Sequence, residues 1–149
     1  IGQIMFVSIY GYVNDQGLTK DLLKSITTYL CQNGKPFIIG GDFNMTPDTL
    51  VASGWLSAVH AKVMHAPSGE AAFIGNQGQG SAIDFFVVSN SLAPFVNKAW
   101  VEDGPTCIRG HRPVSNSITP PRGDTATWQR CRPTPLLVTS PVAPQRLHP

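Results

Sequence analysis

The sequence is poor in cysteine, in charge and in long apolar runs, and each shortage argues against a class of protein. Its three cysteines, Cys31, Cys107 and Cys131, are odd in number and lack metal-ligand spacing, so no disulfide framework is predicted. A reducing compartment, inside the cell, is therefore the default expectation. No apolar run reaches 18 residues, so no membrane-spanning helix is predicted. Only 13% of the residues are charged but 42% are hydrophobic, which is typical of a globular chain.

A basic surface is also missing from most of the chain. Residues 1–118 hold seven Lys and Arg against eight Asp and Glu, so the net charge of +2 comes from the residues beyond them. Proteins that bind nucleic acid usually carry a basic patch, and the charge pattern gives no support for tight duplex binding. The first ten residues lack a basic start and a small-residue cleavage site, so no signal peptide is predicted there.

Composition divides the chain into a body and a tail. The 149 residues correspond to one domain. From residue 119 onward proline becomes frequent, with seven of the 13 prolines of the chain. Proline lacks a backbone donor and interrupts helices and sheets. Residues 1–118 are therefore predicted to form a folded α/β domain, and residues 119–149 a disordered proline-rich tail.

Periodicity within the body predicts a strand, a helix and a second strand. Residues 3–10 favour a strand, residues 18–31 place apolar side chains at helical spacing, and Gly34 provides a helix stop. The apolar run Phe37–Ile39 predicts a buried strand. A helix between two strands is the crossover that joins parallel strands. Further expected elements are a short helix from Thr46 to about Gly54, a strand over 55–64, a loop over 66–80 lying over the site, and strands over 81–89, 98–102 and 113–118.

Polar side chains follow the buried strand Phe37–Ile39. Gly40 and Gly41 allow a turn there, and Asp42 and Asn44 come directly afterwards. On an extended segment, side chains two residues apart point to the same face. Open α/β sheets bind ligands at such strand ends, so a site is one interpretation. An ordinary Gly-Asp-Asn turn is the alternative.

Two further stretches place a polar residue beside apolar ones. Asp84 stands between Ile83 and Phe85, where a buried carboxylate is costly without a partner. His111 precedes the last apolar segment of the body, and a surface or core histidine is the alternative reading.

These stretches, in this order, resemble the endonuclease/exonuclease/phosphatase superfamily of metal-dependent phosphoesterases. The motif Gly-Asp-Phe-Asn occurs literally at 41–44, and a Ser-x-Ile-Asp strand occurs at 81–89. Tyr10 and Asn14 resemble the family's Tyr…Asn strand end. Residues 111–114 resemble the family's final His-x-Pro-Val. The resemblance covers about residues 4–118 and implies the C-terminal half of a four-layer α/β sandwich.

The resemblance also implies roles in phosphodiester hydrolysis. Asp42 would orient and activate the attacking water, and Asn44 would hold a phosphoryl oxygen. Asp84 and His111 would form a pair that stabilises charge on the phosphate. Asp42 and Asn44 would hold Mg²⁺, with Mn²⁺ as an alternative. The substrate would be a phosphodiester or phosphate ester, with DNA and RNA among the candidates.

Tyr10 and Asn14 would contact the substrate phosphate, again by resemblance. A strand-end aromatic and a turn asparagine are equally good interpretations of these two residues. Arg112 follows His111, and a solvated arginine is the interpretation we favour for it.

Two departures from the family leave catalysis open. The family's upstream Asn and metal-binding Glu would lie before Ile1, which makes the chain resemble a fragment, and Gly110 stands where the family has an Asp. Hard cations are held mostly by carboxylates, so both departures weaken a Mg²⁺ site. One hypothesis is a nuclease-like hydrolase represented by its C-terminal half. The other is a non-catalytic remnant that binds phosphate or nucleic acid at most.

Overall fold

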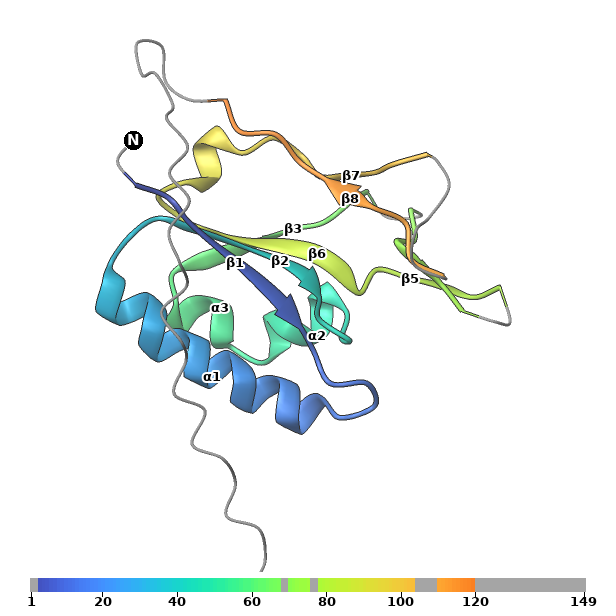
Figure 1. The fold of residues 1–149 in the computed structure, drawn as a ribbon, viewed down its shortest axis with the longest axis horizontal. Helices are drawn as coiled ribbons and strands as arrows, with labels where there is room; N and C mark the ends of the chain where they lie inside the picture. Colours follow the sequence, from blue (N-terminus) through green and yellow to red (C-terminus); the bar gives the residue numbers. More distant parts are fainter. Residues whose placement is uncertain (1–2, 68–69, 76–77, 104–109, 120–149) are drawn as a thin grey trace, which may run out of the picture.

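The computed structural model describes residues 3–67, 70–75, 78–103 and 110–119 of the chain. The predicted tail from residue 120 onward and most of the loop between 103 and 110 lie outside the described residues. The described part is a mixed α/β fold, as predicted (Figure 1). Its elements are β1 (Met5–Tyr10), α1 (Gln16–Asn33), β2 (Phe37–Asp42), α2 (Pro47–Ala52), α3 (Trp55–Ala58), β3 (Ala61–Met64), β4 (Phe73–Ile74), β5 (Gly80–Ser81), β6 (Asp84–Ser89), the 3₁₀ turn η1 (Ala93–Phe95), β7 (Trp100–Val101) and β8 (Val114–Ser115).

A four-stranded sheet with the order β1-β2-β6-β3 forms the centre. Strands β1 and β2 are parallel, and helix α1 connects them, which confirms the predicted crossover. Strand β6 runs antiparallel to β2 and to β3. The remaining strands form two small hairpins, β4–β5 and β7–β8.

Residues that flank α1 cap both of its ends. The carboxylate of Asp15 accepts from the N–H of Leu18 at 2.9 Å, so the helix begins two residues earlier than predicted. At the other end the N–H of Gly34 donates to the carbonyl of Leu30 at 3.0 Å, as the predicted stop requires. None of the helices in the described part is long and apolar enough to cross a membrane.

The three α-helices cover one face of the sheet (Figure 1). Leu23, Ile26 and Leu30 of α1 are buried against strand residues in one core cluster. Within that cluster the rings of Phe43 and Phe85 stack with their centroids 4.1 Å apart and an interplanar angle of 8°. This face of the sheet is therefore closed by packing.

The strand predicted over residues 55–64 is wrong in its first half. Residues Trp55–Ala58 form the helical turn α3, and only Ala61–Met64 joins the sheet. The indole N–H of Trp55 donates to the carbonyl of Leu23 at 3.1 Å and to Oγ1 of Thr27 at 2.7 Å. These bonds to α1 fix Trp55 in place, and no local sequence pattern predicts them.

The opposite face of the sheet is covered differently. Ile38 and Val88 pack there with Leu92 and Val96, which flank the 3₁₀ turn η1. Strands β7 and β8 lie beyond this face, on the side away from the helices (Figure 1). The complete four-layer sandwich that the resemblance implies stays a prediction.

Candidate active site

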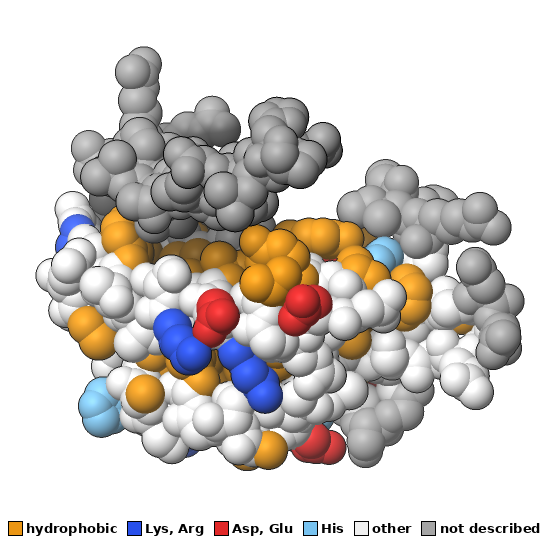
Figure 2. Space-filling model, turned by 90° about the horizontal axis from the view of Figure 1, so that it is seen from below, with side chains coloured by type: hydrophobic (Ala, Val, Ile, Leu, Met, Phe, Trp, Pro, Cys, Tyr) orange, Lys and Arg blue, Asp and Glu red, His pale blue; other side chains and the backbone are white. Residues whose placement is uncertain are grey.

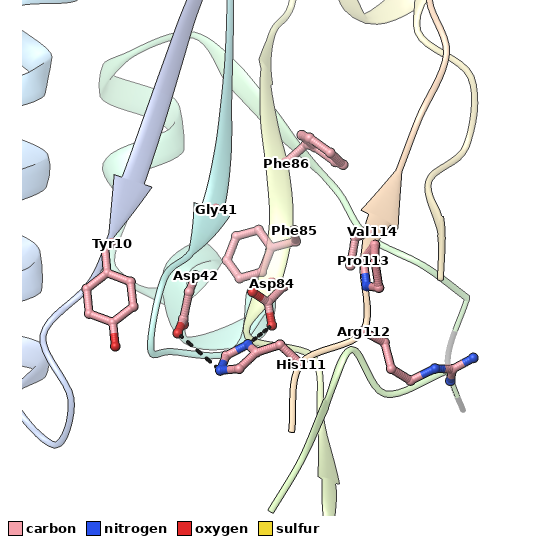
Figure 3. Close-up of a pocket in the computed structure, with 10 residues that line it drawn as sticks. All are labelled: Tyr10, Gly41, Asp42, Asp84, Phe85, Phe86, His111, Arg112, Pro113 and Val114. Carbon is pink, nitrogen blue, oxygen red and sulfur yellow. Dashed lines mark hydrogen bonds and ion pairs between the residues drawn. The ribbon is translucent and has the colours of Figure 1, made fainter. Parts of the chain in front are cut away.

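The register of the sheet places three predicted site residues in one row. Tyr10 of β1 is the partner of Asp42 of β2, and Asp42 is the partner of Asp84 of β6. Paired residues direct their side chains to the same face of a sheet, and their neighbours in sequence point to the other. Because Ile9 and Phe85 belong to the helix-side core, the row faces away from the helices. Figure 3 shows the three side chains at the ends of adjacent strands.

Strand β2 reaches Asp42 because glycine allows a close approach of β1. A turn at Gly40 and Gly41 was predicted, but both residues remain in the strand. Gly41 has φ +148°, and a Cβ there would collide with the backbone carbonyl of Ile9. A residue with a side chain at position 41 would push β1 away and separate Tyr10 from Asp42.

His111 joins this row from a distant part of the chain. Its Nδ1 lies 3.0 Å from Oδ2 of Asp84, and its Nε2 lies 3.9 Å from Oδ2 of Asp42 (Figure 3). The Asp42 side chain is buried, and those of Asp84 and His111 are 19% and 22% exposed. The predicted pairing of Asp84 with His111 is therefore present in the structure.

Burial governs the ionisation of Asp84. Loss of water raises the pKa of its carboxyl above the ordinary value of 3.8. The hydrogen bond and the charge of His111 oppose this shift, and the neighbouring carboxylate of Asp42 adds to it. The imidazole thus favours the ionised form of Asp84, and Asp84 in turn orients the imidazole through their hydrogen bond.

Asn44 fixes Asp42 in a way that the strand pattern did not predict. Asn44 has φ +48°, so the segment is not extended and the two side chains do not alternate along a strand. Its backbone N–H donates to Oδ1 of Asp42 at 2.8 Å, and its Nδ2 donates to the carbonyl of Gly11 at 2.8 Å. This hydrogen bond is an Asx turn made by the side chain of Asp42, in keeping with the turn considered as the alternative, and it holds one carboxylate oxygen of Asp42.

A cavity of about 530 Å³ opens beside the row. Tyr10, Asp42, Asp84 and His111 line it together with an apolar wall, and neither Asn14 nor Asn44 is among the described residues that do so. Phe86, Pro113 and Val114 provide the apolar side chains of this wall, and Phe85, whose ring packs in the helix-side core, also lines the cavity. Asn14 is exposed in the turn before α1, with φ +59°.

Two neighbours of His111 complete the surroundings of the site. The ring of Phe73 lies 4.7 Å from the imidazole, centroid to centroid, and sequence reasoning missed it because the segment 66–80 carries no motif. Arg112 also lines the cavity, but its guanidinium donates to Asp103 at 2.7 Å rather than remaining only solvated. In Figure 3 the Arg112 side chain points away from Asp42.

Three side chains of the site could hold a metal ion. Asp42, Asp84 and His111 each offer one ligand atom, and these atoms lie within 4.8 Å of one another. The predicted ligands were Asp42 and Asn44, so only Asp42 is common to the two sets.

Surface charge near the helices is mixed rather than basic. Figure 2 shows basic and acidic side chains side by side on that face of the molecule. On helix α1, Lys24 forms an ion pair with Asp21 at 2.8 Å. Among its described residues, this face of the molecule therefore shows no basic patch, in line with the charge balance of the sequence.

Comparison with known proteins identifies both a sequence family and a fold. The pattern of the Endonuclease/Exonuclease/phosphatase family matches residues 11–134. No curated protein matches the chain in sequence. Among solved structures, cytolethal distending toxin from Actinobacillus actinomycetemcomitans is similar, with 16% identity and a TM-score of 0.56 over 79% of this chain and 50% of that one.

Two nucleases share the same fold. A 3′-5′ exonuclease from Neisseria meningitidis matches with 16% identity and a TM-score of 0.58, over 76% of this chain and 60% of that one. An AP endonuclease from Archaeoglobus fulgidus matches with 15% identity and a TM-score of 0.53, over 79% of this chain and 62% of that one. At these identities the likeness shows the fold alone. The chain spans about half to three fifths of the length of these three structures.

Proposed function

Because the chain belongs to the endonuclease/exonuclease/phosphatase family, we propose that the cavity beside Asp42, Asp84 and His111 is the phosphate-ester site of a hydrolase. The observation that carries the proposal is the orientation of one imidazole. Its Nδ1 is bonded to Asp84 while its Nε2 is turned toward Asp42. Nε2 is thus available to the cavity, next to a buried carboxylate.

The three side chains divide the chemistry of hydrolysis among them. Asp42 accepts a hydrogen bond from the attacking water and aligns it, while the Asn44 N–H fixes the carboxylate. His111 donates from Nε2 to a phosphoryl oxygen, where negative charge must be stabilised. Asp84 accepts from Nδ1, and the doubly protonated form of the imidazole is the one that can donate from Nε2 as well. Tyr10, at the edge of the cavity, is the proposed phosphate contact from β1.

The donor set fits a divalent cation, with Asp42 as its anchor. Oδ1 of Asp42 accepts from Asn44, whereas Oδ2 accepts no backbone hydrogen bond from the described residues. His111 Nδ1 is already bonded to Asp84, so carboxylate oxygen is the more available donor. Oxygen donors suit Mg²⁺ and Mn²⁺, and a bound cation would neutralise phosphate charge. We propose Asp84 as the second carboxylate ligand, because its ligand atom lies within 4.8 Å of that of Asp42, whereas Asn44 is not among the described residues that line the cavity.

The proposed substrate is a phosphodiester, with DNA or RNA as candidates. Two structures with the same fold are named as an exonuclease and an AP endonuclease, which supports a nucleic-acid substrate. The absence of a basic excess in residues 1–118, with seven Lys and Arg against eight Asp and Glu, favours weak over tight binding of such a polymer. Small phosphodiesters therefore provide the first test.

The test is hydrolysis of bis(4-nitrophenyl) phosphate by the 149-residue chain with Mg²⁺, with Mn²⁺ or with EDTA. We expect release of 4-nitrophenolate only with a cation present. His111→Gln should lower the rate by about a hundredfold or more, as for a lost hydrogen-bond donor to developing charge. His65→Gln is the matched control, because His65 is an exposed histidine that bonds only to the neighbouring carbonyl of Ala66 among the described residues. Equal rates for His111→Gln and the wild type would refute the proposal.

A phosphate-binding module without catalysis is the second candidate. Gly110 favours it, because the carboxylate expected before His111 is absent from the chain. Binding of inorganic phosphate that depends on His111, without turnover of the diester, would support this candidate over the first.

A further inference from the structure

The backbone brings Phe73 and His111 together from distant parts of the sequence. Phe73 pairs with Ser81 of β5 on one edge of β4, and it forms an isolated antiparallel bridge with His111 on the other edge. Strand β4 is thus the middle of three adjacent segments. The segment that contains His111 therefore lies along the outer edge of the β4–β5 hairpin.

The hydrogen bonds around this bridge bring the two side chains close. The N–H of Ile74 donates to the carbonyl of Gly110 at 2.7 Å, and the N–H of Arg112 donates to the carbonyl of Ala72 at 2.6 Å. These two bonds flank the bridge, and neither is made by the backbone of Phe73 or His111. In an antiparallel pair this is the non-hydrogen-bonded position, where the facing side chains are closest.

The two rings are consequently in contact. Their centroids lie 4.7 Å apart with an interplanar angle of 53°, a tilted arrangement typical of favourable aromatic pairs. The hydrogen bond to Asp84 holds one edge of the imidazole but leaves rotation about that bond free. Contact with the ring of Phe73 restricts this rotation and therefore the direction of Nε2.

We infer that Phe73 is a positioning residue for His111. The inference rests on the proposed function, in which Nε2 of His111 donates to a phosphoryl oxygen. Asp84 sets which nitrogen of His111 faces the cavity, and Phe73 sets the plane of the ring. Nothing in the sequence pattern of the segment 66–80 predicts this role, because the bridge depends on tertiary structure.

Gly110 is part of the same arrangement. It has φ +84°, and a Cβ there would lie 3.0 Å from Cε2 of Phe73 and 3.0 Å from the carbonyl oxygen of Ile74. A side chain at position 110 would therefore press against the ring that holds His111. The glycine at position 110 therefore leaves room for the Phe73 ring where it contacts His111.

The test is NMR of the isotopically labelled 149-residue chain, with inorganic phosphate as the probe. In the wild type we expect nuclear Overhauser effects between the Phe73 ring and the His111 imidazole, and one set of imidazole ¹⁵N signals. Phe73→Leu keeps an apolar side chain but removes the ring. It should broaden or average the ¹⁵N signals of His111 and weaken phosphate binding by about tenfold.

Two variants provide rescue and control. Phe73→Tyr keeps the ring and should restore both readouts to within about twofold of the wild type, the scatter expected of a conserved contact. Ile74→Ala removes the side chain of the next residue in β4, which is 46% exposed, and should leave the His111 signals unchanged.

The outcomes separate this inference from the proposed function. If the wild type shows no Overhauser effects between the two rings, the inference is overturned without any variant. It is also overturned if Phe73→Leu leaves the His111 signals unchanged. If those signals do move but the wild type neither binds phosphate nor hydrolyses the diester, the positioning role stands and the proposed function fails.

Discussion

The two faces of the central sheet follow different physical rules. On the helix side, Phe43 and Leu50 are fully buried in a continuous apolar core. On the other side, the strands end in a row of polar and aromatic residues beside a cavity, and Tyr10 is 69% exposed. Alternation along each strand sends consecutive residues to the two faces. One sequence can therefore build a closed core and an open site from the same three strands.

The largest expected effect is on the closed face. Phe43→Ala removes a ring stacked at 4.1 Å on Phe85 and should lower the free energy of unfolding by about 3–5 kcal/mol. Tyr10→Ala, on the open face, should change it by less than about 0.5 kcal/mol. Urea denaturation of both variants measures the difference. Similar losses in the two variants would contradict the contrast between the faces.

A smaller effect is expected at the edge of the open site. Gly110→Asp places a side chain at φ +84° against Phe73 and should cost about 1–3 kcal/mol of unfolding free energy. We expect no gain in Mn²⁺ affinity by calorimetry, although the change restores the residue that the family resemblance leads one to expect.

Gly78→Asp is the matched control for that substitution. Gly78 has φ +76°, and a Cβ there would meet nothing within 4 Å. Gly78 therefore shares the left-handed backbone of Gly110 but not its crowding. Gly78→Asp should lower the free energy of unfolding by less than Gly110→Asp does. A stable Gly110→Asp variant with tighter Mn²⁺ binding would show that the site is more open than the structure indicates.

The smallest effect is the dependence of stability on pH through Asp84. Because burial raises the pKa of this carboxyl above 3.8, the folded state binds the proton more tightly than the unfolded state. The stabilisation is therefore complete below pH 3.8 and is lost as the pH rises through the folded-state pKa.

Asp84→Asn removes this titration. The stability of the variant should therefore rise relative to that of the wild type as the pH increases from 3.8 through the folded-state pKa of Asp84. Urea denaturation at a series of pH values from about 3 to 7 measures the difference, spanning the reference carboxyl pKa. Asp48→Asn, which removes an exposed carboxylate, is the comparison. A constant difference between Asp84→Asn and the wild type would mean that burial does not govern this group.

Local sequence predicted the closed face better than the open one. The helical spacing of Leu23, Ile26 and Leu30 predicted α1 and its buried side. The apolar run before Asp42 predicted a buried strand, although the strand continued through two glycines. These features depend on neighbours within a few residues, which is the range that periodicity reports.

The open face needed information that is not local. Motif resemblance named Asp84 and His111, and the structure brings them to 3.0 Å. It did not name Phe73, because the contact with His111 depends on a bridge between segments far apart in the chain. Likewise, Trp55 begins a helical turn that is bonded to α1, where local alternation favoured a strand.

The most direct test of the open face as a hydrolytic site compares two carboxylates. Asp42→Asn and Asp48→Asn make the same chemical change, in the cavity and on the exposed first turn of α2 respectively. In cation-dependent hydrolysis of bis(4-nitrophenyl) phosphate, we predict a fall of about a hundredfold or more for Asp42→Asn and a rate close to that of the wild type for Asp48→Asn. Equal rates for the two variants would contradict the assignment of the site.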